Sequence, residues 1–273
     1  MTSPPPPDYA ELRDLCERYV RAAGSLAKAG RVAAREGAAL AELTKSSPTD
    51  LVTEFDRAAE RLIVEAIRRD RPDDTIIGEE GADHVGQSGL AWHVDPIDGT
   101  TNFVYDLPTW ACSVGVVHDG VGVAGAVYAP MVDELYAAAA GHGATLNSVP
   151  IRVSALTDPA LALIATGFAY QPDTRVAQAR QLLGLAAHVR DFRRFGAASY
   201  DLCLVACGRV DAYYEQNLNS WDMVAGEVIC REAGAVTSDW SGGPVRPAEL
   251  LAAAPGIHSE FLTLLQRAAA GTV

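Results

Sequence analysis

A strand-like apolar run is followed by the segment D-P-I-D-G-T-T, residues 95–101, whose residue types could bind a metal ion. Pro96 should end the strand ladder, and the carboxylates of Asp95 and Asp98 could then converge on one cation. Gly99 lets the backbone approach a ligand closely, and the residues after it could begin a short helix whose free N–H groups face an anion. The spacing therefore predicts that a metal ion and a phosphate group meet at this segment.

A bare D-x-x-D pair is more often a polar turn after a strand than a metal site. The longer string D-P-I-D-G-T-T-N-F, residues 95–103, is much more specific. At every position it resembles the signature of the inositol monophosphatase family, the Mg2+-dependent, lithium-sensitive phosphatases. Three further segments resemble motifs of that family: G-E-E at 78–80, K-S-S-P-T-D-L-V-T at 45–53 continuing to Asp56, and W-D-M-V-A-G at 221–226. The resemblance spans nearly the whole chain, from about residue 38 to residue 256.

The resemblance implies that two or three Mg2+ ions are held by acids from distant parts of the chain. Glu79, Asp95 and the backbone carbonyl of Ile97 would hold one ion. Asp95, Asp98 and Asp222 would hold a second, so that Asp95 bridges the two. Several cations suit phosphate ester hydrolysis, because charge develops on the attacking water, the phosphoryl oxygens and the leaving oxygen. Taken singly, Glu79 would be a solvated strand end and Asp222 a helix N-cap.

Water activation is assigned by the same resemblance to Asp56 and Thr100, with Glu79 steering the water through a metal ion. The threonine hydroxyl would pass its proton toward the carboxylate of Asp56, so that this carboxylate acts as the general base. Ordinary roles for these two residues would be a first-turn helix acid and a helix cap.

The substrate-binding residues implied by the resemblance are Asp98, Gly99, Thr100, Gly196, Ala198, Glu215 and Asp222. Glu215 lies seven residues before Asp222, where the family places an acid that accepts hydrogen bonds from substrate hydroxyls, so a polyol is expected. The loop at 194–199 departs from the family pattern, because Ala197 stands where a small hydroxyl residue usually follows the glycine. This departure puts ring contacts from that loop in doubt.

Composition excludes several classes of protein. A formal net charge of -13, from 35 acidic and 22 basic residues, repels nucleic acids and anionic membranes. Five widely spaced cysteines without a C-x-x-C pair predict reduced thiols and no disulfide. The chain has neither a secretory signal nor a long apolar span, so we expect a cytoplasmic protein with a disordered tail at residues 1–7. The G-x-G-x-x-G at 120–125 precedes a strand rather than a helix, which argues against nucleotide binding.

The apolar pattern indicates alternating helices and strands. Helical periodicity covers about residues 8–44, as one or two helices, and then 56–69. Strands are predicted at 75–78, 90–94, 111–117 and 123–128, with a tight hairpin at Asp119-Gly120. Farther along, strands are expected at 161–165, 211–215 and near 236 and 251, and helices at 175–187, 200–207, 222–232 and after 257. The pattern predicts an α/β protein with layered helices and sheets, and a single domain over 8–273 with a soft subdivision near 150.

The family resemblance implies a five-layer α/β/α/β/α sandwich, often assembled as a homodimer. The expected activity is hydrolysis of myo-inositol 1-phosphate and similar polyol monophosphates. Histidinol phosphate, fructose 1,6-bisphosphate and 3'-phosphoadenosine nucleotides are the competing substrates. A regulatory protein that keeps the fold and binds another macromolecule is a different class, and the complete set of acids argues against it.

Overall fold

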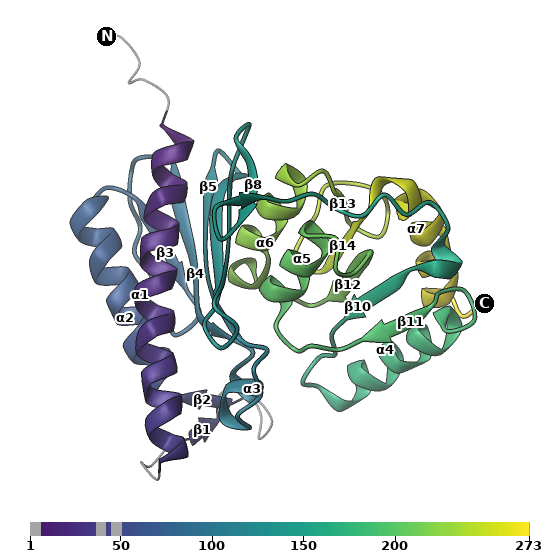
Figure 1. Ribbon diagram of the computed structural model, residues 1–273, viewed down its shortest axis with the longest axis horizontal. Helices are drawn as coiled ribbons and strands as arrows, with labels where there is room; N and C mark the ends of the chain where they lie inside the picture. The colour runs from purple at the N-terminus through teal and green to yellow at the C-terminus, as the bar shows by residue number, and fades with distance from the viewer. Residues whose placement is uncertain (1–6, 37–41, 45–50, 273) are drawn as a thin grey trace.

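The computed structural model describes residues 7–36, 42–44 and 51–272, so the predicted tail lies outside it except for Pro7. Helices and two sheets stack in five layers, which confirms the expected sandwich (Figure 1). Helices α1 (Tyr9–Arg35) and α2 (Glu54–Asp70) cover the outer face of the first sheet. Helices α5 (Ala198–Ala206) and α6 (Ser220–Glu232) form the middle layer, and α4 (Pro172–Leu185) and α7 (Pro255–Ala269) cover the far side of the second sheet.

The first sheet has seven strands in chain order, β3 to β9. They are β3 (Thr75–Gly78), β4 (Leu90–Asp98), β5 (Ala111–His118), β6 (Val121–Ala129), β7 (Glu134–Ala139), β8 (Gly143–Leu146) and β9 (Val149–Pro150). Only β3 and β4 are parallel, and the other neighbours are antiparallel. The predicted hairpin between β5 and β6 is confirmed, with Asp119 and Gly120 both at positive φ, as a two-residue turn of this kind requires.

The second sheet has five strands in the order β11-β10-β12-β14-β13. They are β10 (Leu163–Thr166), β11 (Asp191–Arg193), β12 (Ala212–Gln216), β13 (Val236–Ser238) and β14 (Glu249–Ala253). Strand β10 begins at Leu163 and not at residue 161 as predicted, because Pro159–Leu161 forms a short 3-10 turn. Strands β7 to β9 and β11 were not predicted, and their Ala-rich or very short sequences have little strand signal.

Two local predictions were wrong. The helix predicted to reach about residue 44 ends at Arg35, and β1 (Glu42–Thr44) pairs instead with β2 (Leu51–Thr53). Pro96 does not end β4, which continues to Asp98. The ladder to β5 instead shifts register between Asp95 and Asp98, and this irregularity accommodates the missing N–H of the proline.

The middle layer lies very close to the first sheet because glycines face it. A Cβ on Gly125 would be 2.7 Å from the Cα of Ala225, and one on Gly122 would be 2.7 Å from Val228 Cγ2. These two glycines belong to the G-x-G-x-x-G string, whose role is therefore helix packing. The close approach fixes α6, and with it the residues at its N-terminus.

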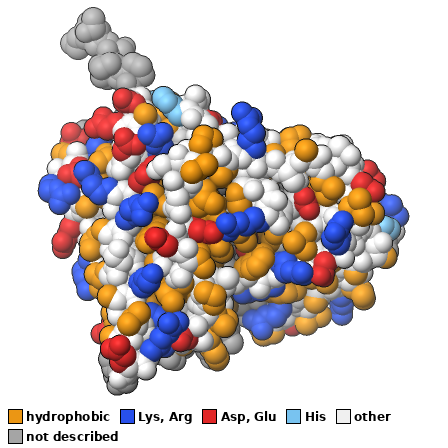
Figure 2. Space-filling view, viewed as in Figure 1, with side chains coloured by type: hydrophobic (Ala, Val, Ile, Leu, Met, Phe, Trp, Pro, Cys, Tyr) orange, Lys and Arg blue, Asp and Glu red, His pale blue; other side chains and the backbone are white. Residues whose placement is uncertain are grey.

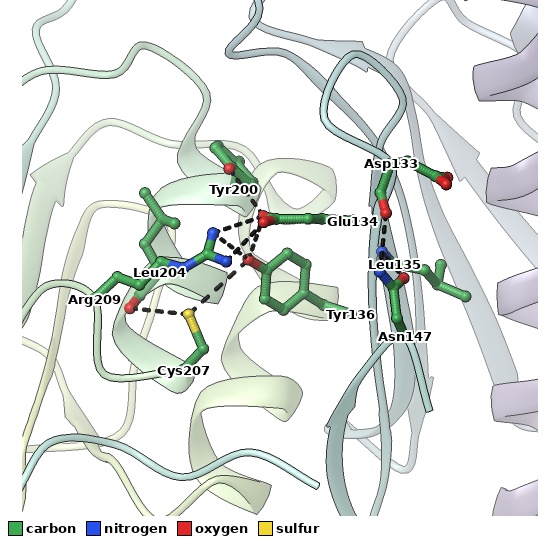
Figure 3. Close-up of polar contacts among 9 residues, drawn as sticks. All are labelled: Asp133, Glu134, Leu135, Tyr136, Asn147, Tyr200, Leu204, Cys207 and Arg209. Atoms are coloured by element: carbon green, nitrogen blue, oxygen red, sulfur yellow. Dashed lines mark hydrogen bonds and ion pairs between the residues drawn. The ribbon is translucent and has the colours of Figure 1, made fainter. Parts of the chain in front are cut away.

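A polar network also joins the first sheet to the middle layer (Figure 3). Arg209, which follows α5, forms a two-pronged ion pair with Glu134 of β7 at 2.7 and 2.8 Å. The same carboxylate accepts hydrogen bonds from the hydroxyls of Tyr136 and Tyr200.

All five cysteines are free thiols. Within the described residues no helix is long and apolar enough to span a membrane.

Candidate active site

A cavity of about 280 Å³ opens where the ends of both sheets meet the middle layer. It is lined by every residue singled out from the sequence except one: Glu79, Asp95, Ile97, Asp98, Gly99, Thr100, Gly196, Ala198, Glu215 and Asp222. The exception is Asp56, which lies behind the cavity wall and contacts Thr100. The structure thus gathers residues that are far apart in sequence, while their chemical roles stay predictions.

Asp56 is a buried carboxylate in the first turn of α2. Thr53, the N-cap, donates its backbone N–H to Asp56 Oδ2 at 2.7 Å, and this contact is half of a capping box. The hydroxyl of Thr100 lies 3.2 Å from Asp56 Oδ1 and can donate to it. Burial raises the pKa of Asp56 to about 6, against the opposing effect of the Thr53 hydrogen bonds. The helix-capping role and a role as a base are therefore compatible.

Five carboxylates line the cavity and repel one another, those of Glu79, Asp95, Asp98, Glu215 and Asp222. Burial raises the pKa of Asp95 well above its usual value, and the charges of Glu79, Asp98 and Asp222 raise it further. Asp95 Oδ1 also accepts the backbone N–H of Ile97 at 3.0 Å. Among the described residues, no three acidic, histidine or cysteine side chains already surround one point as a finished metal cage. The oxygen donors nevertheless suit Mg2+, because a hard cation prefers oxygen ligands and would relieve their repulsion.

Asp98 has a second function, as the cap of α5. Its Oδ2 accepts the N–H and the hydroxyl of Ser199, each at 2.6 Å, and its Oδ1 accepts the N–H of Ala198 at 3.2 Å. Helix N-termini need such acceptors. The N-cap of α5 is Ala197, which has no acceptor of its own. Asp98, at the end of β4 in the first sheet, thus supplies the capping acceptor that the Ala197 side chain lacks.

Gly99 and Asn102 bring the signature segment against the loop that precedes α5. Gly99 has φ +89 and starts α3 (Thr100–Val104), and a Cβ there would lie 3.0 Å from the carbonyl oxygen of Gly196. Asn102 Nδ2 donates to the carbonyls of Thr109 at 2.5 Å and Phe195 at 2.7 Å. Sequence reasoning gave Asn102 no role, although it is the eighth residue of the signature.

Glu215 enters the cavity from β12. Its carboxylate lies against Gly167, where a Cβ would overlap it, and it accepts a short hydrogen bond from the hydroxyl of Tyr213. Burial raises the pKa of Glu215 to about 7, with the Tyr213 hydrogen bond and the charge of Arg194 opposing the shift. Sequence reasoning missed Arg194, which also lines the cavity.

Glu60 is a buried acid that the sequence reasoning also missed. It lies one helical turn after Asp56 and is 2% exposed. Its carboxylate accepts the backbone N–H groups of Glu80 at 2.8 Å and Ala82 at 3.1 Å, and so holds the turn that contains Glu79. Its i, i+4 spacing from Asp56 puts both acids on one face of the helix, and this spacing could have identified Glu60 from the sequence.

Taken singly, Asp222 was expected to be a helix N-cap, and the structure shows that it is not. Asn219 is the N-cap of α6, and Asp222, three residues on, accepts its N–H at 2.6 Å. In the N-terminal motif, residues 45–50 lie outside the described part of the chain, and only the segment leading from β2 into α2 can be placed.

The chain and its fold resemble proteins already known. The model of the inositol monophosphatase family matches residues 11–270. An inositol-1-monophosphatase from Mycobacterium leprae is 46% identical over 237 residues, covering 82% of this chain and 80% of that protein. A Nus factor SuhB from Pasteurella multocida is 42% identical over 230 residues, covering 82% of this chain and 86% of that protein. The solved structure of Mycobacterium tuberculosis SuhB has a TM-score of 0.82 at 37% identity and covers 96% of this chain and 98% of that one.

Proposed function

Because this chain belongs to the inositol monophosphatase family and has relatives named inositol-1-monophosphatase, we propose that it hydrolyses myo-inositol 1-phosphate and similar polyol monophosphates to the free polyol and phosphate. The observation that carries the proposal is the single cavity in which acids from both sheets meet beside the Asp56–Thr100 pair. The name of the Mycobacterium leprae relative supports inositol 1-phosphate as the first substrate to test.

Two or three Mg2+ ions complete the proposed site and supply the positive charge that stabilises the phosphoryl and leaving oxygens. Glu79, Asp95 and the Ile97 carbonyl would hold one ion, and Asp95, Asp98 and Asp222 the next. The fit rests on the donor set, because burial and the charges of Glu79, Asp98 and Asp222 raise the pKa of Asp95, and burial and the charges of Asp98 and Glu79 raise the pKa of Asp222.

The protein groups then have separate tasks. Thr100 holds the nucleophilic water and passes a proton toward Asp56, whose pKa of about 6 leaves it mostly ionised at neutral pH. Glu215 accepts hydrogen bonds from hydroxyls of the polyol, and its own hydrogen bond from Tyr213 fixes the carboxylate. The N–H of Ala198 is already donated to Asp98, so a substrate contact from Ala198 has to use another atom.

Phosphate release from a panel of esters tests the proposal. The panel is myo-inositol 1-phosphate, histidinol phosphate, fructose 1,6-bisphosphate and 3'-phosphoadenosine 5'-phosphate. We expect turnover that requires Mg2+, falls with lithium and has its highest kcat/KM on the inositol ester. Turnover without a metal, or none on any ester, would contradict it. A higher kcat/KM on another ester would keep the phosphatase and change its substrate.

A regulatory role remains the alternative, because relatives of similar identity are named Nus factor SuhB. The intact set of acids favours catalysis. A cytoplasmic location and a homodimer stay predictions, and sedimentation of the purified chain would test the second.

A further inference from the structure

A second chamber, of about 320 Å³, adjoins the carboxylate-lined cavity. Its lining is Thr101, Phe168, Tyr170, Arg175 and Arg194. Three of these residues, Phe168, Tyr170 and Arg194, also line the first cavity. A ligand bound at the carboxylates can therefore extend past these shared residues into the second chamber.

The two chambers have opposite charge. The first is lined by Glu79, Asp95, Asp98, Glu215 and Asp222, with a single arginine. Among the described residues that line the second chamber, two are arginines and none is acidic. In Figure 2 basic side chains also gather along the lower right edge, where Figure 1 places α4. In a chain with a formal net charge of -13, such a local reversal of sign favours an anionic ligand at this point.

Arg194 is positioned by the backbone of its own loop. Gly196 has φ +93, and a Cβ there would overlap Arg194 Nη1, so the guanidinium folds back over the glycine toward the cavity. Its charge opposes the rise in pKa that burial causes at Glu215 and Asp201. Arg194 therefore lies between the acid proposed to bind the polyol and the second chamber.

Arg175 forms the other side of the chamber. It lies in the first turn of α4, and its Nε and Nη2 donate to the carbonyls of Ala169 at 3.1 Å and Tyr170 at 3.0 Å. These bonds tie the arginine to the backbone that carries Phe168 and Tyr170. A guanidinium has five N–H donors, so the N–H groups of Arg175 that do not bind these two carbonyls can contact an anion.

We propose that the second chamber binds a second phosphate group, carried on the alcohol part of the substrate. The inference rests on the proposed function and extends its substrate class from polyol monophosphates to the bisphosphates of the same polyols. One phosphate reacts at the carboxylates. Water attacks its phosphorus, the ester bond breaks, and the leaving oxygen takes a proton and becomes a hydroxyl. The other phosphate stays intact on Arg175 and Arg194, because guanidinium groups bind phosphate through paired N–H donors.

The test compares mannitol 1-phosphate with mannitol 1,6-bisphosphate, whose two ends are equivalent by symmetry and whose flexible chain lets the second phosphate find its position. We expect the wild-type kcat/KM to be at least about tenfold higher for the bisphosphate, more than the factor of about two given by two equivalent ends. In the double variant Arg175→Gln, Arg194→Gln this ratio should fall to about two. Arg193→Gln is the matched control, because Arg193 pairs with Asp191 and lines neither chamber, and it should keep the wild-type ratio.

The outcomes separate the two proposals. If the wild type hydrolyses mannitol 1-phosphate but shows no preference for the bisphosphate, the second chamber is not a phosphate subsite and the phosphatase stands. The same conclusion follows if the double variant keeps the preference, or if Arg193→Gln loses as much of it. If neither these esters nor the panel of esters is hydrolysed by the wild type, the proposed function fails first. A preference lost only in the double variant supports the subsite.

Discussion

The two sheets contribute different chemistry to the same cavity. The first-sheet side, with α2, carries acids held by local backbone donors, such as Asp56 by Thr53 and Asp95 by Ile97. The second-sheet side carries Glu215, which is held by a side chain, the hydroxyl of Tyr213. Asp56 also accepts the hydroxyls of Thr53 and Thr100, so its position is fixed by more donors than that of Glu215. The difference suggests that the first side performs the reaction, which tolerates little displacement, and the second adapts to the alcohol.

Asp98 and Asn102 join the two sides. Both come from the signature segment, yet Asp98 caps α5 and Asn102 binds the Phe195 carbonyl in the loop before it. The first-sheet side, proposed to perform the reaction, therefore positions the second-sheet side, proposed to bind the alcohol. Substitutions on the first side should affect all esters, and those on the second should affect esters selectively.

The largest effect should come from Asp95→Asn, since Asp95 is the proposed bridging ligand. We expect kcat to fall about 1000-fold or more on every ester, the equivalent of losing several kcal/mol of charge stabilisation. Without metal the variant should melt at a higher temperature than the wild type, because a buried charge and its repulsion with Glu79 are removed. Calorimetry with and without Mg2+ measures this. A variant with normal kcat, or one that melts lower without metal, would contradict the assignment.

Thr100→Ala should have the next largest effect, a loss in kcat of about a hundredfold on all esters, because the hydroxyl that relays the proton is gone. Thr100→Ser is the matched control and should retain most of the activity. A serine variant as slow as the alanine variant would show that the hydroxyl is not the active feature.

The pKa of Asp56, about 6, gives the pH dependence of the reaction. The base is protonated below that pH, so kcat/KM should fall as pH falls through 6 and level off above it.

Much of this first side was predictable from sequence, for a physical reason. A metal and phosphate site needs particular residue types in a short segment, so D-P-I-D-G-T-T-N-F could be identified from its residues, although its first four residues lie within β4 rather than after it. The path of β4 through Pro96 was not predictable, because it depends on the register shift against β5. The capping of α5 by Asp98 depends on contact between residues a hundred positions apart, and no local pattern indicates it.

The second side was less predictable. Arg194 is one of several arginines between 175 and 194, and nothing in the sequence separates it from Arg193, which faces Asp191. What distinguishes the two is contact with Gly196, whose missing Cβ leaves room for the Arg194 guanidinium beside the cavity. Positions of this kind are set by the fold and appear only in the structure.

Glu215→Gln tests whether the second-sheet side selects among esters. The amide keeps an acceptor for Tyr213 but is a weaker acceptor for substrate hydroxyls, so kcat/KM for myo-inositol 1-phosphate should fall about tenfold or more. Phenyl phosphate, whose alcohol part has no further hydroxyl, should lose much less. The ratio of the two values is the measurement. An equal loss on both esters would place Glu215 with the reacting groups and remove the distinction between the two sides.

Glu60→Gln should give the smallest effect, and one confined to metal affinity. Glu60 contacts the backbone of the turn that presents Glu79, through the N–H groups of Glu80 and Ala82. A glutamine can accept one of these bonds well but turns its amide N–H toward the other, so the turn should loosen. We expect the Mg2+ concentration for half-maximal rate to rise about threefold to tenfold, with kcat at saturating Mg2+ nearly unchanged. Glu65→Gln, an exposed change on the same helix, is the control and should move neither quantity. A lower kcat at unchanged Mg2+ dependence would mean that Glu60 acts on the water or the ester rather than through the position of Glu79.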